Sequence, residues 1–204
     1  LLKAGSAPAW QVPLLQEFFV IAYIVLAPFA GPFADTLPKG RVMFFSNAIK
    51  VVGCLMMLLG AHPLPAYAVV GLGAAAYSPA KYGILTELLP PSQLVKANGW
   101  IEGLTIVSII LGAVVGGMLM HPHLFDLLLQ MDLQHHFIDR HISSPPKLAI
   151  AFIMVFYLLA SVINTRIPRT DAPLQPLPKN IFSLLPEFWQ CNKLLWQDKL
   201  GQIS

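Results

Sequence analysis

Long apolar runs separated by short polar joints dominate the pattern along this chain of 204 residues. A bilayer core is about 30 Å thick, so a helix needs about 20 mostly apolar residues to cross it. The pattern predicts an all-α membrane protein with spans over residues 13–33, 42–60, 64–89, 99–120 and 148–167. A longer joint, 121–147, precedes the last span, and a proline-containing tail, 171–204, follows it.

The two polar segments carry apolar residues of their own. The 121–147 joint mixes leucines with Asp and His, which predicts an extracytoplasmic insertion that lies on the membrane surface. His135 and Asp139 lie one helical turn apart there, but we expect solvent-facing or headgroup-facing histidines rather than a metal site. The amphipathic stretch 181–200 is expected to lie on the membrane surface within a cytoplasmic linker.

Composition supports the membrane interpretation and excludes other classes. The chain is 56% hydrophobic and 11% charged, whereas soluble domains average about 25% charged residues. A net charge of +3 is too weak to indicate a nucleic-acid partner. Cys54 and Cys191 have no metal-binding or redox spacing, and no phosphate-binding Gly-rich motif is present. We therefore expect no enzyme, no catalytic residue, no metal and no cofactor.

Basic residues assign the sides of the membrane. They occur in alternate joints, and such joints are cytoplasmic: Lys39, Arg41, Lys96, Arg166 and Arg169. The joint at His62 has no Lys or Arg, and the basic residues of the 121–147 joint are offset by aspartates. The chain then starts on the extracytoplasmic side of the membrane, which leads us to expect an earlier span, with residues 1–4 as its last turn.

Small residues inside the spans predict close helix packing. Helices in lipid associate where small side chains let backbones approach. The run 71–76 is built from Gly, Ala and Leu, and Gly112, Gly116 and Gly117 form a small-residue face in the fourth span. We interpret both as ordinary packing surfaces.

Ionisable residues inside the spans are costly and are therefore candidate functional residues. Lys50 lies roughly 12 Å inside the membrane, where it either binds an anion or pairs with a residue of another helix. The sequence predicts a substrate-binding or polar cavity formed by Lys50, Asn47, Tyr77, Lys81, Tyr82 and Glu102. Glu87 and Lys96 flank the next cytoplasmic joint and form a candidate cytoplasmic gate, with plain structural pairing as the alternative.

The joint between the first two spans resembles the loop between helices two and three of the major facilitator superfamily. Gly31, Asp35, Lys39 and Arg41 match its G-x-x-x-D-x-x-x-[RK]-x-[RK] pattern. The resemblance implies helices two to six of twelve, a partial N-terminal half, and a gating loop that braces the cytoplasmic side in the outward-open state. On chemical grounds we expect Gly31 to admit a neighbouring helix. Asp35 needs a cationic or N–H partner at its helix end, and Lys39 and Arg41 should lie at lipid headgroups.

Two further strings resemble the bacterial lysophospholipid transporter family, Tyr77-Ser-Pro-Ala-Lys-Tyr-Gly83 and Leu94-Val-Lys-Ala-Asn-Gly-Trp-Ile-Glu102. The likeness covers about residues 1–120 and then resumes weakly. It implies inward movement of lysophospholipids, such as lysophosphatidylethanolamine, across the bacterial inner membrane. It also implies a functional link to an acyltransferase and acyl-carrier-protein synthetase.

Two other functions stay open from the sequence. One is a proton-coupled exporter of drugs or metabolites; the glycines at 112–117 favour it, but the proline of the antiporter motif is absent. The other is the membrane module of a fused acyltransferase–acyl-carrier-protein ligase, which downstream soluble domains would reveal.

Overall fold

The computed structural model describes residues 11–121, 123, 127, 144–170, 172–178 and 180–197, and within them every regular element is helical. The all-α prediction is therefore confirmed. The predicted surface helix of the 121–147 joint, its His135 and Asp139, and the turn at 1–4 lie outside the described residues. The elements are α1 (Gln11–Thr36), α2 (Lys39–Leu58), α3 (Pro63–Leu88), α4 (Pro91–Leu119), α7 (Pro145–Asn164), the short 3-10 helix η1 (Ile181–Ser183) and α8 (Leu184–Gln197).

Prolines define where three of these helices begin. Pro63, Pro91 and Pro145 each lie in the first turn, where the missing N–H has no intrahelical partner to lose. Helix α4 begins before the span predicted over 99–120, because the polar residues after Pro91 are already helical. Residues 145–147, assigned to the long joint, belong to α7.

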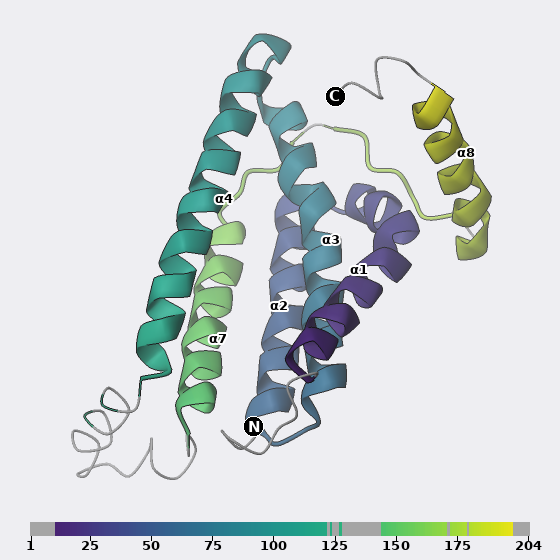
Figure 1. Cartoon of the computed structure of the whole chain (residues 1–204). Coiled ribbons are helices and arrows are strands. Elements are labelled where there is room, and N and C mark those ends of the chain that lie inside the picture. Colours follow the sequence, from purple (N-terminus) through teal and green to yellow (C-terminus); the bar gives the residue numbers. More distant parts are fainter. Residues whose placement is uncertain are drawn as a thin grey trace.

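Helix α3 lies at the centre of the packing, against α1 on one side and α2 on the other, and α2 also packs against α7 (Figure 1). Glycines allow these close approaches. A Cβ on Gly73 would lie 2.6 Å from the carbonyl oxygen of Ser46, and one on Gly71 would lie 2.9 Å from that of Phe19. The predicted role of the small residues in the third span is confirmed.

Helix α4 lies at the edge of the bundle, beside α7 (Figure 1). None of its residues is buried. A Cβ added at Gly112, Gly116 or Gly117 would meet nothing within 4 Å. The prediction that this face packs against a helix is wrong within the described part of the chain, because no described element reaches it.

Four described helices are long and apolar enough to cross a membrane: Pro13–Thr36, Lys39–Leu58, Pro91–Leu119 and Pro145–Asn164. The central helix α3 is not one of them, and its crossing stays a prediction. The three joints predicted to be cytoplasmic, namely α1 to α2, α3 to α4 and the segment after α7, lie at the same end of the bundle (Figure 1).

Candidate functional site

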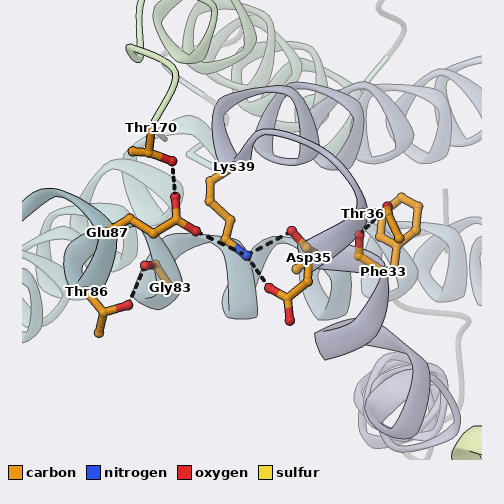
Figure 2. A network of polar contacts seen from close by, with 9 residues as sticks. Phe33, Asp35, Thr36, Lys39, Gly83, Thr86, Glu87 and Thr170 are labelled. Atoms are coloured by element: carbon orange, nitrogen blue, oxygen red, sulfur yellow. Dashed lines mark hydrogen bonds and ion pairs between the residues drawn. The ribbon is translucent and has the colours of Figure 1, made fainter. Parts of the chain in front are cut away.

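A buried lysine organises the end of the bundle that the sequence predicts to be cytoplasmic. Lys39 is the first residue of α2, four residues after Asp35 near the end of α1, and its side chain is only 7% exposed. Its ammonium group forms an ion pair with Asp35 and donates a hydrogen bond to the carbonyl oxygen of Ala34 at 3.0 Å (Figure 2). Asp35 therefore has the cationic partner that its position at a helix C-terminus requires.

Glu87, near the end of α3, completes this network. Its Oε1 lies 3.6 Å from the Lys39 ammonium, and its Oε2 accepts a hydrogen bond from the Thr170 hydroxyl (Figure 2). The backbone N–H of Gln175 donates to the carbonyl oxygen of Asp35 at 3.0 Å. The α1–α2 joint, the end of α3 and the segment after α7 are thus held together by one set of polar contacts.

The segment after α7 also packs closely at this end. A Cβ on Gly40 would lie 3.0 Å from the Asn164 carbonyl oxygen, and Ile167 packs on an apolar cluster that includes Val42 and Ala80. A cavity of about 250 Å³ lies beside the network. Asp35, Lys39, Glu87 and Thr170 contribute to its lining.

One expectation about the gating residues is wrong, and two others have no supporting contact among the described residues. Lys39 is buried in the network rather than extended to lipid headgroups, because two carboxylates and a carbonyl surround it; Arg41 is exposed. A Cβ on Gly31 would meet nothing within 4 Å, so no described helix uses the close approach expected there. Lys96 is exposed and forms no ion pair with Glu87 among the described residues, since Glu87 is directed to Lys39 instead.

Three of the six predicted cavity residues lie inside the bundle. Lys50 of α2 is 8% exposed and donates to the Asn47 side-chain oxygen at 3.2 Å. Its ammonium lies 4.3 Å from the ring centre of Tyr77 on α3 and 5.3 Å from that of Tyr157 on α7. Such ring contacts stabilise a cation by roughly 0.5–2 kcal/mol each, whereas burying a charge costs several kcal/mol.

The other three lie on the face shared by α3 and α4. The Lys81 ammonium donates to the Thr105 hydroxyl at 3.2 Å, and the Tyr82 hydroxyl donates to a Glu102 oxygen at 2.6 Å. A cavity of about 420 Å³ opens beside them. Its lining is mainly apolar, with a few polar side chains: Ile101, Leu104, Ile109, Lys81, Thr105 and Ser108.

The predicted single cavity is therefore divided into an interior group and an α3–α4 face. Tyr77 and Lys81 are one helical turn apart on α3 but belong to different groups. Sequence reasoning missed Thr170 and Thr105, for which the chain gives no local signal. It also missed Tyr157, Ser161 and Asn164, although their spacing of three to four residues within an apolar run could have revealed one polar helix face.

Comparisons with known proteins indicate the family of the chain. Residues 9–198 match the family model described as Major Facilitator Superfamily. The whole chain is 42% identical to a protein of Photorhabdus laumondii and 40% identical to one of Yersinia pestis, both named lysophospholipid transporter LplT. The chain spans 46% and 45% of those proteins, about half their length. No solved structure matches. Because the family model covers nearly the whole chain, this chain belongs to the major facilitator superfamily.

Proposed function

We propose that the whole protein containing this chain moves lysophospholipids, such as lysophosphatidylethanolamine, inward across the bacterial inner membrane by alternating access. Identity of 40–42% over the full chain to proteins named lysophospholipid transporter supports this substrate. The function is transport rather than catalysis, and the protein hands its product to an acyltransferase–acyl-carrier-protein synthetase for re-esterification.

The cavity on the α3–α4 face carries the proposal. A lysophospholipid combines an anionic phosphate with one acyl chain, and this cavity combines the Lys81 ammonium with an apolar wall. Lys81 would attract the phosphate, while Ile101 and Leu104 would contact the chain. Hydrogen bonds to Thr105 and Glu102 orient Lys81 and Tyr82 of α3 toward α4. The polar side chains of the two helices therefore meet along their contact.

The Asp35–Lys39–Glu87 network would act as the cytoplasmic gate. It joins three segments that must separate before substrate can leave toward the cytoplasm. Since its charges are paired with one another, opening the gate requires those pairs to dissociate or find new partners.

Uptake of labelled lysophosphatidylethanolamine tests the proposal. The complete protein is expressed in spheroplasts that lack their own transporter, and Lys81→Gln is compared with Lys193→Gln on the exposed face of α8. We expect wild-type protein and Lys193→Gln to transport, and Lys81→Gln to lose at least tenfold in uptake at equal expression. Absence of uptake by well-expressed wild-type protein would refute the lysophospholipid assignment.

A further inference from the structure

The interior group around Lys50 is rich in hydrogen-bond donors that have no partner. Five polar residues are more than nine-tenths buried where α2 packs on α7: Ser46, Asn47, Lys50, Ser161 and Asn164. Three of their side-chain atoms have no hydrogen-bond partner in the described structure: Ser46 Oγ, Asn47 Nδ2 and Ser161 Oγ. Buried polar atoms are rarely left unpaired, so each of them calls for a partner.

The partner that these atoms lack is a hydrogen-bond acceptor. The Asn47 amide nitrogen can only donate, and both hydroxyls can donate as well. Lys50 has one neutral acceptor, the Asn47 oxygen, and no ion pair with any carboxylate among the described residues. The faces of Tyr77 and Tyr157 attract a cation but accept no conventional hydrogen bond in this arrangement.

The chain is arranged to hold the lysine in this place. The stem of Lys50 crosses α3 at Gly73, where an added Cβ would lie 2.8 Å from the lysine Cγ. The ammonium then lies between rings contributed by α3 and α7. The cation is thus fixed by two neighbouring helices and by Asn47 one turn away, which is the preorganisation that an anion site needs.

We propose that Lys50, Asn47 and the unpaired donors of α2 and α7 form an interior oxyanion-binding site, separate from the Lys81 cavity. Its occupant is a phosphate or carboxylate group, for which ammonium and amide N–H groups are charge-assisted donors. The group comes either from the headgroup of the transported lipid, in which case this step rests on the proposed function, or from an acidic side chain of the protein outside the described residues.

The test uses the complete protein in detergent and compares Lys50→Gln and Asn47→Asp with wild type, with Lys50→Arg as the charge-keeping control. Asn47→Asp places a carboxylate where the Asn47 oxygen already lies 3.2 Å from the ammonium. Melting temperature is measured without ligand and with lysophosphatidylethanolamine. Monoacylglycerol with the same acyl chain, which has no phosphate, is the matched probe, and inorganic phosphate is tested separately.

If the lipid supplies the oxyanion, lysophosphatidylethanolamine raises the melting temperature of wild type and Lys50→Arg. The affinity for lysophosphatidylethanolamine then falls about tenfold or more in Lys50→Gln and Asn47→Asp. Monoacylglycerol binds wild type and the three variants alike. Without ligand, Asn47→Asp melts at a higher temperature than wild type. If the protein supplies it, the lipid shift is unchanged, but both Lys50→Gln and Asn47→Asp melt earlier without ligand. In the second variant two carboxylates would then share one cation.

The inference is overturned if Lys50→Gln melts no earlier than wild type and keeps the full lipid shift. Uptake by wild-type protein is a separate measurement. Loss of the proposed function appears as no uptake at all, whereas loss of this inference appears as a Lys50→Gln variant that matches wild type in both melting and binding.

Discussion

Replacing Glu87 by glutamine isolates the charge of the cytoplasmic network. Glutamine keeps an oxygen that accepts from the Thr170 hydroxyl, so that contact survives. The ion pair with Lys39 is lost. Lys39 retains Asp35 and the Ala34 carbonyl, so the substitution weakens the network without leaving its ammonium unpaired.

The magnitude follows from the distance and the burial. At 3.6 Å the Coulomb attraction is roughly 5 kcal/mol for an effective dielectric constant of about 20. The Glu87 side chain is 17% exposed, so water recovers part of this energy, and the remaining partners of Lys39 recover more. We expect a net loss of about 1–2 kcal/mol, which corresponds to a roughly 5–30-fold change in the opening equilibrium.

Hydrogen exchange measures that opening directly. In Glu87→Gln we expect amide exchange to become roughly 5–30-fold faster in the first turn of α2 and at Gln175, whose N–H donates to the Asp35 carbonyl. Glu102→Gln is the matched control, because it removes the same charge from an exposed contact with Tyr82 on the α3–α4 face. Equal exchange in wild type and Glu87→Gln would show that the Lys39 ion pair does not hold this end closed.

Three other outcomes test the packing and the exposure. Gly73→Ala should cost about 1–3 kcal/mol of stability, because its Cβ would lie 2.6 Å from a carbonyl of α2, whereas Gly99→Ala, with nothing within 4 Å, should not destabilise; equal melting temperatures would contradict this packing. Tyr82→Phe should lower stability by no more than about 1 kcal/mol, because it removes one exposed hydrogen bond; a larger loss in thermal unfolding would mean that the contact is buried in the whole protein. A water-soluble maleimide should label exposed Cys191 and leave buried Cys54 unmodified in the folded protein; rapid double labelling, read by mass spectrometry, would argue against the described core.

The cytoplasmic network illustrates how far sequence reasoning reached. The spacing of Asp35 and Lys39 indicates a charged joint, and the position of Asp35 at a helix end requires a cationic or N–H partner. Lys39, four residues further along the chain, is that cation. Glu87 and Thr170 are separated by 83 residues, so no local pattern could pair them. The same limitation explains why the sequence groups Lys96 with Glu87 as a candidate gate and predicts Lys39 at lipid headgroups.

The sequence by itself determined the apolar runs, their approximate ends and the gathering of the basic joints at one end of the bundle. These properties depend on hydropathy and charge, which are local and must match the bilayer. Only the tertiary structure decided which polar residues meet. It put Lys50 between rings of α3 and α7 and Lys81 against α4, although both were expected in one cavity. Rotation and lateral packing of helices direct side chains at similar depth to different faces, and those two quantities depend on contacts between distant parts of the chain.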